Sequence, residues 1–302
     1  MKIVVIGSIN MDLVMKVKRL PEKGETLTAQ SYITVPGGKG ANQAVAAARL
    51  GAEVLMIGAL GNDGFGEDLL QKLIEEGVGT DGIRRVEGPT GNALITVDEN
   101  GDNTILVYPG ANQEVTPAWV QQQESIIEKA DWVMLQLEIP MNSVVEAARL
   151  AKKRNKKVLL NPAPAAALPE ELISLVDVIT PNETELALLS GSDDIATGAE
   201  LLLQRGISTV VVTLGDKGSV AYTVSTSITA PPFKVKAVDT TAAGDTFNAA
   251  LITAIGQGKK LEDALIYANA AGGLATTKMG AQSSLPTRVE VDGFIKKNQA
   301  QG

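Results

Sequence analysis

The sequence predicts an α/β fold with a largely parallel central sheet and a second, smaller sheet. Short β-branched runs alternate along the chain with Ala- and Leu-rich segments of helical period, which is typical of βαβ units. Two stretches, residues 12–35 and 91–108, interrupt this alternation and leave no room for crossover helices. With 302 residues, 44% of them hydrophobic, the chain is long and apolar enough for one large domain over residues 1–302.

Strands of the central sheet are expected in the short apolar runs, and helices in the intervening segments with a period of 3.6 residues. The expected strands are residues 3–6, 53–57, 132–135, 157–160, 177–179, 209–213 and 219–222. The expected helices are residues 41–50, 66–76, 117–129, 143–154, 183–190, 195–204, 246–257 and 261–278.

The two interrupting stretches are expected to form the smaller sheet. Both consist of extended segments separated by turns, and Asn100-Gly101 lies between alternating apolar residues, which is a strong hairpin signal. A sheet at the carboxyl edge of a parallel core is well placed to act as a lid over a binding crevice. An edge extension of the core or a dimer surface would give the same pattern.

Composition argues against several classes of function. The formal net charge of −8 argues against binding nucleic acid or anionic lipid through overall charge, and 3% aromatic residues argue against base-stacking platforms. The absence of cysteine and histidine removes Ser-His-Asp and Cys-His nucleophile systems and Cys/His zinc sites. No apolar run approaches the length of a membrane span, and the chain starts in a strand-like segment without a basic leader, so a cytoplasmic location is expected.

Residues 239–247, Asp-Thr-Thr-Ala-Ala-Gly-Asp-Thr-Phe, are the strongest candidate for a catalytic site. They predict a tight turn of small residues before an apolar helix, where backbone N–H groups and the helix dipole favour a negatively charged group. Asp245 at the start of that helix is placed to accept a proton from an attacking hydroxyl, while neighbouring amides hold the developing charge. Taken alone, however, Asp245 is better explained as an ordinary helix N-cap.

A glycine-rich segment at residues 36–43, Pro-Gly-Gly-Lys-Gly-Ala-Asn-Gln, precedes another expected helix. It is not a Walker P-loop, because Gly40 follows Lys39, and the turn after the first strand lacks the G-x-G-x-x-G spacing of a Rossmann fingerprint. The amides of this segment, with Lys39 and Asn42, can donate hydrogen bonds to the hydroxyls of a polyol. A plain helix start is the alternative interpretation.

Polar residues follow several expected strands, at the edge where open α/β sheets bind ligands. Asn10 and Asp12 follow the first strand and Glu138 follows another apolar strand, so all three are candidates for holding sugar hydroxyls. Asn182 and Glu185 come after a third strand and are candidates for contacts with Mg²⁺ or phosphate oxygens through water. Turn preference or simple solvation would explain each of them in isolation.

In this order and spacing, these segments resemble the ribokinase family of carbohydrate kinases, also called the PfkB family. The resemblance extends from Ile3 to about Phe294, with residues 37–50 similar to the amino-terminal signature of the family and residues 239–247 similar to its carboxyl-terminal signature. It implies a three-layer αβα core with a mostly parallel central sheet, and a β-sheet lid formed by residues 12–35 and 91–108.

The resemblance also implies which residues hold the sugar and the transferring phosphate. The implied ligands of the pentose hydroxyls are Asn10, Asp12, Gly38, Lys39, Asn42 and Glu138. Asp245 is implied to be the base that takes the proton of the ribose 5-hydroxyl, with Ala242, Ala243 and Gly244 forming the anion hole for the phosphate.

ATP, Mg²⁺ and a monovalent cation, K⁺, are implied by the same resemblance. The implied nucleotide contacts are Asn182, Thr213, Gly215, Gly218, Gly244 and Asn269, with Glu185 near Mg²⁺ through water. The implied K⁺ positions, most of them acting through backbone carbonyls, are Asp239, Thr241, Ala275, Lys278, Gly280 and Ser284. Taken by themselves, residues 213–218 are explained equally well as a hairpin.

The predicted function is therefore ATP-dependent phosphorylation of the 5-hydroxyl of D-ribose to D-ribose 5-phosphate. The alternatives are a sibling kinase acting on 2-deoxyribose, a nucleoside or a hexose phosphate, and a sugar- or nucleotide-binding regulator without catalysis. The predicted partners are the small-molecule sugar and a second copy of the chain, paired through edge strands of the lid sheet. No nucleic-acid or membrane partner is expected.

Overall fold

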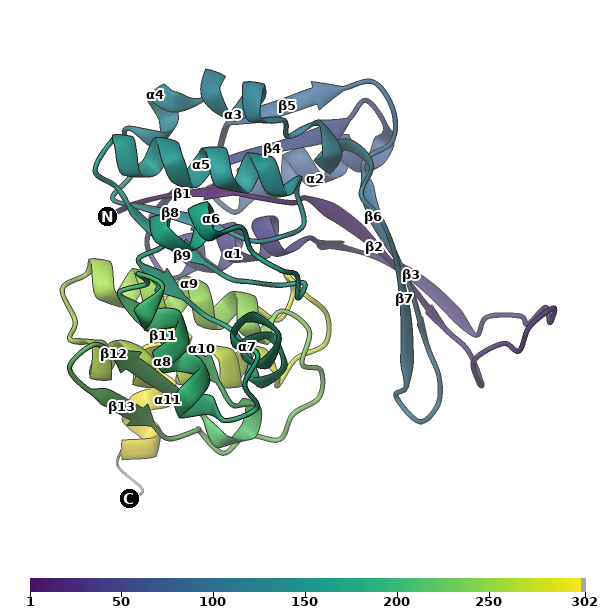
Figure 1. Ribbon diagram of the computed structural model, residues 1–302. Helices are drawn as coiled ribbons and strands as arrows, with labels where there is room; N and C mark the ends of the chain where they lie inside the picture. Colours follow the sequence, from purple (N-terminus) through teal and green to yellow (C-terminus); the bar gives the residue numbers. More distant parts are fainter. Residues whose placement is uncertain (300–302) are drawn as a thin grey trace.

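A computed structural model describes residues 1–299, which form two sheets and the helices that cover the larger one (Figure 1). Within these residues the central sheet has nine strands in the order β13-β12-β11-β10-β9-β8-β1-β4-β5, and the second sheet has four in the order β3-β2-β6-β7. The strands of the central sheet from β11 to β5 run parallel, whereas β12 pairs antiparallel with both β11 and β13.

The strands and helices follow one another in the alternation that the sequence predicts. The strands of the central sheet are β1 (Lys2–Ile6), β4 (Glu53–Gly61), β5 (Gly79–Val86), β8 (Trp132–Leu135), β9 (Lys157–Leu160), β10 (Val178–Ile179), β11 (Thr209–Thr213), β12 (Ser219–Thr223) and β13 (Ser227–Ala230). The helices are α1 (Lys39–Arg49), α2 (Gly64–Glu75), α3 (Pro117–Gln122), α4 (Glu124–Ile127), α5 (Met141–Lys153), α6 (Glu170–Leu175), α7 (Glu183–Ser190), α8 (Ile195–Gln204), α9 (Ala243–Gly256), α10 (Leu261–Ala275) and α11 (Arg288–Gln299). There are also two short 3₁₀ helices among the described residues, η1 (Gly110–Glu114) and η2 (Gly215–Lys217).

The central sheet is the middle layer of three, because apolar side chains leave both of its faces. In β1, Ile3 and Val5 belong to one buried cluster, whereas Val4 and Ile6 belong to the other. Helices α1, α2, α9, α10 and α11 bury apolar residues in the first cluster, and α3 to α8 do so in the second. The predicted three-layer αβα fold is confirmed. No helix within residues 1–299 is both long and apolar enough to cross a bilayer.

The predicted strands of the central sheet are confirmed, but two strands and two helices were not predicted. Strands β5 and β13 and helices α6 and α11 lie in segments whose periodicity is weak, since β5 carries charged residues and two glycines and β13 is only four residues long. The helix predicted at 117–129 is divided into α3 and α4. Helix α9 begins three residues earlier than expected, at Ala243, and α10 ends at Ala275 rather than at 278.

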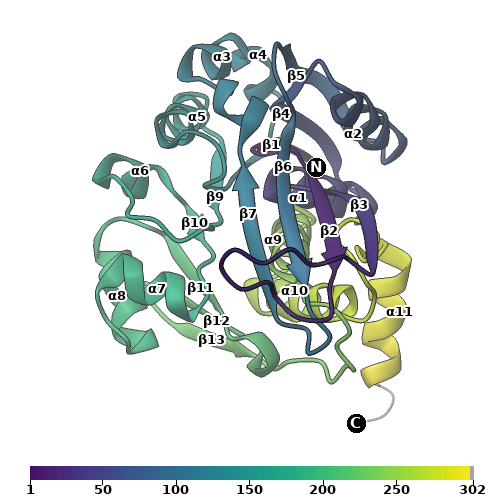
Figure 2. The same cartoon turned by 90° about the vertical axis from the view of Figure 1, so that its right-hand side faces the viewer.

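The small sheet is built from β2 (Asn10–Lys16), β3 (Ser31–Gly37), β6 (Gly91–Val97) and β7 (Asn103–Tyr108). It projects from the core in Figure 1, and Figure 2 shows its strands side by side with β3 and β7 at the edges. The hairpin expected at Asn100-Gly101 is confirmed, but its loop runs over residues 98–102, because the Asp98 carboxylate accepts hydrogen bonds from the backbone N–H groups of Asn100 and Asp102.

The start of helix α1 lies directly against the backbone that follows β1, and two glycines allow this contact. Gly38 is the N-cap of α1 with φ of 88°, a conformation that favours glycine. A Cβ at Gly40 would lie 2.6 Å from the backbone N of Ser8, closer than real side chains approach. The glycines of the predicted polyol-binding turn therefore serve first to bring two stretches of protein backbone together.

Replacing Gly40 with alanine should destabilise the protein by about 2 kcal/mol, because the added methyl group meets rigid backbone rather than a side chain that can move. Gly64→Ala is the matched control, since Gly64 also lies in the first turn of a helix but a Cβ there would meet no described atom within 4 Å. The free energy of unfolding of this control in urea should stay equal to that of the wild type or rise slightly. Equal stability of the two variants would contradict the close contact.

Candidate active site

A polar cavity of about 200 Å³ lies at the carboxyl ends of the parallel strands, where helices α1, α7 and α9 begin. This is the edge at which open α/β sheets bind ligands. It is lined by Lys39, Asn161, Ala163, Thr180, Asn182, Glu185, Thr213, Thr240, Ala242, Gly244, Asp245 and Asn248. The cavity thus brings together predicted residues from both halves of the sequence.

The Asp245 carboxylate lies at this cavity but is held by helix α1. Its Oδ2 accepts a hydrogen bond from Asn42 Nδ2 and its Oδ1 accepts one from Gln43 Nε2, each at 3.0 Å. The N-cap position of α9 is occupied by Ala242, and no described side chain caps the helix. The interpretation of Asp245 as an ordinary N-cap is therefore wrong. Asp245 is only 6% exposed, has no ion pair within residues 1–299, and is turned toward the glycine-rich turn.

The start of α9 offers backbone donors to an anion. Ala242 is in the left-handed conformation with φ of 61°, which turns the chain sharply into the helix. The N–H groups of Gly244 and Asp245 have no acceptor among residues 1–299, and a Cβ at Gly244 would meet no described atom within 4 Å. Open donors at the positive end of a helix dipole form a suitable place for a phosphate oxygen.

A second set of predicted residues gathers around the start of α1. Glu138 Oε2 accepts hydrogen bonds from Ser8 Oγ at 2.5 Å and from the backbone N of Lys39 at 3.0 Å. Asn10 Oδ1 accepts from Asn112 Nδ2 at 2.7 Å, and Asn112 is itself fixed by both backbone groups of residue 9. Because their hydrogen bonds fix the side chains of Glu138 and Asn10, these two polar groups have defined positions before any ligand binds.

Asp12, on strand β2, accepts no hydrogen bond from any donor among residues 1–299. Burial, with smaller contributions from the nearby carboxylates of Glu138 and Asp245, raises the pKa of Asp12 from 3.8 to about 7. The carboxylate lies over Gly37, where a Cβ would approach Asp12 Oδ2 to 2.2 Å. An ionised Asp12 therefore lacks the donors that sugar hydroxyls could supply.

Lys39 is the one cationic side chain of the described residues that lines the cavity. Its burial lowers the pKa, but the carboxylates of Asp245, Glu138 and Glu185 outweigh that effect, so the pKa of Lys39 lies above its ordinary value. The ammonium group therefore stays charged and lies among carboxylates from three different elements. Burial raises the pKa of Glu185, against the opposing effects of the Asn182 N–H group and of Lys39.

The predicted nucleotide residues divide into two groups. Asn182 and Glu185 form a capping box at the start of α7, and both also line the cavity with Thr213 and Gly244. The remaining three, Gly215, Gly218 and Asn269, lie outside its lining. Residues 213–218 do form a hairpin, between β11 and β12. Asn269 donates through Nδ2 to the carbonyls of residues 230 and 231, at 3.0 and 3.1 Å, and so fixes the backbone that follows β13.

The two segments that contain the predicted K⁺ positions are joined through Asp239. Its carboxylate accepts hydrogen bonds from the backbone and side chain of Thr241 and from the backbone N of Gly280 at 2.8 Å. Burial would raise the pKa of Asp239, but these hydrogen bonds hold it below its ordinary value. Asp239 therefore stays ionised and connects the turn before α9 to the loop after α10.

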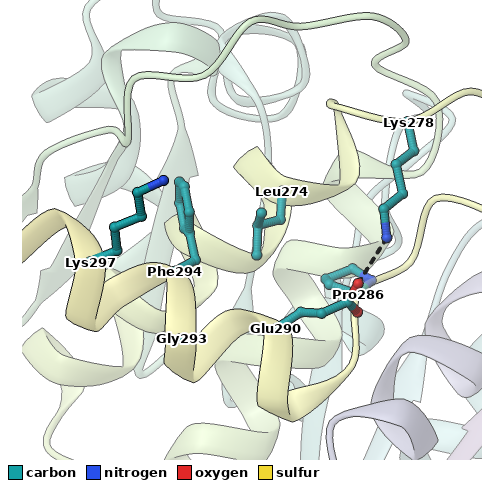
Figure 3. A pocket seen from close by; sticks show the side chains of 7 residues that line it. All are labelled: Leu274, Lys278, Pro286, Glu290, Gly293, Phe294 and Lys297. Carbon is teal, nitrogen blue, oxygen red and sulfur yellow. Dashed lines mark hydrogen bonds and ion pairs between the residues drawn. The ribbon is translucent and has the colours of Figure 1, made fainter.

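The side chain of Lys278 points toward helix α11 and pairs with Glu290 at 2.9 Å (Figure 3). This pair borders a second, mostly apolar hollow of about 280 Å³ between α10 and α11, lined by Leu274, Lys278, Pro286, Glu290, Gly293, Phe294 and Lys297. Although it is the larger hollow, its lining includes none of the groups predicted for sugar or phosphate. A role for Lys278 at a cation is thus compatible only with its backbone carbonyl, as the family resemblance implies.

Several buried polar residues of the site were not singled out from the sequence. Gln43 and Gln136 contact one another behind Asp245, Asn161 joins them, and Asn112 orients Asn10. Gln43 could have been suspected from the sequence, because it is an uncharged polar residue next to Asn42, which was already a candidate. Gln136 lies two residues before the candidate Glu138, so its position was a weaker indication of the same kind. Asn112 lies in the short 3₁₀ helix η1, and no sequence pattern pointed to it.

Comparisons with known proteins agree with this arrangement. A family model, described as pfkB family carbohydrate kinase, matches residues 1–288. A ribokinase from Haemophilus influenzae is 44% identical over 298 residues, which cover 97% of each chain. The crystal structure of a ribokinase from Thermotoga maritima superposes with a TM-score of 0.92 at 40% identity, covering 97% of this chain and 99% of that one. The structure of an Arabidopsis thaliana ribokinase complexed with ribose and ATP gives 0.91 at 35% identity, covering 97% and 98%.

The fold and the site define a carbohydrate kinase, and the chain belongs to the pfkB family.

Asp12→Asn should make the protein more stable than the wild type at high pH. Ionisation of Asp12 occurs near pH 3.8 in the unfolded chain and near 7 in the folded one, so rising pH favours unfolding between these values. The free energy of unfolding of Asp12→Asn minus that of the wild type should rise by about 3 kcal/mol from pH 5 to pH 8.5, measured by urea unfolding without sugar. The control is Asp81→Asn, which removes an exposed carboxylate instead of a largely buried one. A constant difference for Asp12→Asn would contradict the raised pKa.

Proposed function

We propose that the protein transfers the γ-phosphoryl group of ATP to the 5-hydroxyl of D-ribose, giving D-ribose 5-phosphate and ADP. The observation that carries this proposal is the juxtaposition of the buried Asp245 carboxylate with the open N–H groups at the start of α9. Support for ribose as the acceptor comes from the full-length similarity to proteins named ribokinase, one of them in complex with ribose and ATP.

In the proposed reaction the ribose 5-oxygen attacks the γ-phosphorus in line with the leaving group. A bond forms between the sugar oxygen and phosphorus, the bond to the β,γ-bridging oxygen breaks with its electron pair leaving on ADP, and the hydroxyl proton passes to Asp245. The N–H groups at the start of α9 donate to the phosphate oxygens as charge redistributes. Since the transition state of phosphoryl transfer is loose, positioning and these donors supply more of the rate than proton removal.

The sugar ligands that we propose come from the core and from the small sheet. They are Asn10, Asp12, Gly38, Lys39, Asn42 and Glu138, and the fixed positions of Asn10 and Glu138 support this role. Ala242, Ala243 and Gly244 are proposed as the anion hole. The small sheet is proposed to act as the lid over the sugar.

For the nucleotide we propose Asn182, Thr213, Gly215, Gly218, Gly244 and Asn269 as contacts. A cofactor Mg²⁺ would neutralise phosphate charge, with Glu185 reaching it through water. The cavity-facing position of Glu185 and its burial support this role, because an incoming cation would favour its ionised form.

We propose that K⁺ binds beside the anion hole and orders the turn before α9. The proposed ligands are Asp239, Thr241, Ala275, Lys278, Gly280 and Ser284, mainly through backbone carbonyls. The ionised Asp239 and its hydrogen bond to Gly280 support this site, since they already hold the two segments together. A cytoplasmic location stays a prediction.

The alternative functions differ in what they require of the cavity. A hexose phosphate would need basic groups beyond Lys39, and within the described chain no other lysine or arginine lines the cavity. A binding protein without catalysis would not need a buried carboxylate at the open start of α9. Kinases for 2-deoxyribose or a nucleoside would use the same proposed catalytic residues, so only a comparison of substrates in an activity assay can distinguish them from a ribose kinase.

The wild type should phosphorylate ribose in preference to 2-deoxyribose, adenosine, fructose and fructose 6-phosphate, with higher turnover in potassium than in its absence. Asp245→Asn should lower kcat by at least about 100-fold while leaving ribose binding detectable by calorimetry, because the amide keeps the shape but accepts no proton. The control Asp81→Asn should leave kcat unchanged. If the enzyme prefers another sugar, that sugar is the substrate and the proposal of ribose is wrong. No turnover with any sugar would refute the kinase proposal.

We further propose that two copies pair through the small sheet. Large apolar side chains are exposed on its edge strands, including Ile33 on β3 and Ile105, Leu106 and Val107 on β7, the most exposed being Leu106 at 70%.

Leu106→Lys should therefore convert a dimer to a monomer in sedimentation velocity at micromolar concentration, because the charge would be buried in the interface. Val224→Lys is the control, since Val224 is also exposed but lies between β12 and β13 on the core. A wild type that sediments as a monomer would exclude the dimer.

A further inference from the structure

A chain of buried amide side chains connects the end of strand β8 to the Asp245 carboxylate. Gln136 Nε2 donates to Gln43 Oε1 at 2.6 Å, and Gln43 Nε2 donates to Asp245 Oδ1 at 3.0 Å. The second hydrogen of Gln43 Nε2 goes to Asn161 Oδ1 at 3.2 Å. Gln43 and Gln136 are fully buried and neither lines the cavity. They reach the carboxylate through protein and have no access to the space where substrate would bind.

The orientation of each amide in this chain follows from its neighbours. Carboxylates and backbone carbonyls only accept hydrogen bonds, so Asp245 requires the nitrogen of Gln43 to face it. Asn161 Nδ2 points to the carbonyl of Thr180 at 3.5 Å, which leaves its oxygen for Gln43. Gln43 Oε1 must then find a donor elsewhere, and Gln136 provides it. Without Gln136 the buried Gln43 oxygen would have no partner, and a rotated amide would turn that oxygen toward the carboxylate.

We infer that Gln43, locked in place by Gln136, is a positioning residue for Asp245. A hydrogen bond to a carboxylate is among the stronger ones in proteins, and it here fixes the plane in which Asp245 meets the substrate hydroxyl. Both donors to the carboxylate, from Asn42 and Gln43, are neutral amides. They hold the carboxylate through neutral donors, while the nearby Lys39 ammonium forms no ion pair with it within residues 1–299. This inference rests on the proposed kinase function.

The origin of Gln136 adds a consequence for the geometry of the site. Gln136 and Glu138 leave the same strand end, one reaching Asp245 through Gln43 and the other holding the first N–H of α1. Glu138, a proposed sugar ligand, and Gln136, which supports the proposed base through Gln43, therefore lie on one short segment. Displacement of this segment would move both together.

The test compares Gln43→Met, Gln136→Met and the double variant with the wild type, using ribose and ATP. Gln43→Met keeps the volume but removes the donor, so kcat should fall at least about 10-fold while KM for ribose changes less than about 3-fold. The acid limb of the pH–rate profile should move to higher pH, because the ionised carboxylate loses a donor. Gln136→Met should act in the same direction but less strongly.

The double variant should be no worse than Gln43→Met alone, because Gln136 acts only through Gln43. Gln123→Met is the matched control, a buried glutamine near α3 whose side chain forms no hydrogen bond within residues 1–299. It should leave kcat and the pH–rate profile unchanged.

Unchanged kcat and pH–rate profile in Gln43→Met would overturn the inference, and so would additive losses in the double variant. If Gln43→Met does not fold, as shown by circular dichroism, Gln136→Met carries the test, and a wild-type kcat for it overturns the inference. A wild type that phosphorylates no sugar would instead refute the kinase function, and the positioning role with it.

Discussion

The hydrogen bonds from helix α1 to the Asp245 carboxylate are the interaction on which the arrangement of the site depends. They join residues 203 and 202 positions apart in the chain and bring the two predicted signature segments to one place. Each side of this contact needs its own support. The glycines at the start of α1 let that helix sit against the end of β1, and the left-handed Ala242 directs α9 toward it. A displacement of either helix would leave a buried carboxylate without partners, which is costly in free energy.

Charge at the site is arranged so that one lysine balances several carboxylates. Lys39 keeps its proton because Asp245, Glu138 and Glu185 surround it, while Asp12 has no hydrogen-bond donor in the part of the chain that the structure describes. The site without ligands therefore contains a carboxylate whose ionised form is unfavourable. Hydroxyl donors from a bound sugar would satisfy it, so binding and proton release at Asp12 are expected to be coupled near neutral pH.

The core strands and most of the residues that line the candidate cavity could be predicted from the sequence, for identifiable reasons. Buried parallel strands are short apolar runs, and the two signature segments combine rare glycine and polar patterns with helix starts. Helix α11 and strand β5 were not predicted, because their apolar residues do not repeat with a clear period. The hydrogen-bonded amides of Gln43, Gln136 and Asn161 were not predicted for another reason. A buried glutamine is recognised by its partners, and these come from separate strand ends and helices that only the fold brings together.

If two of the proposed sugar ligands lie on the small sheet, a mechanical consequence follows. Strand β2 begins at Asn10, so Asn10 and Asp12 belong to the small sheet, whereas Lys39, Glu138 and Asp245 belong to the core. A sugar that contacts both groups acts as a tether between two bodies, and its binding energy includes the work of bringing them together. Binding of the sugar as proposed would then change the angle between the small sheet and the core, and a pair of spectroscopic labels on the two bodies would measure that change.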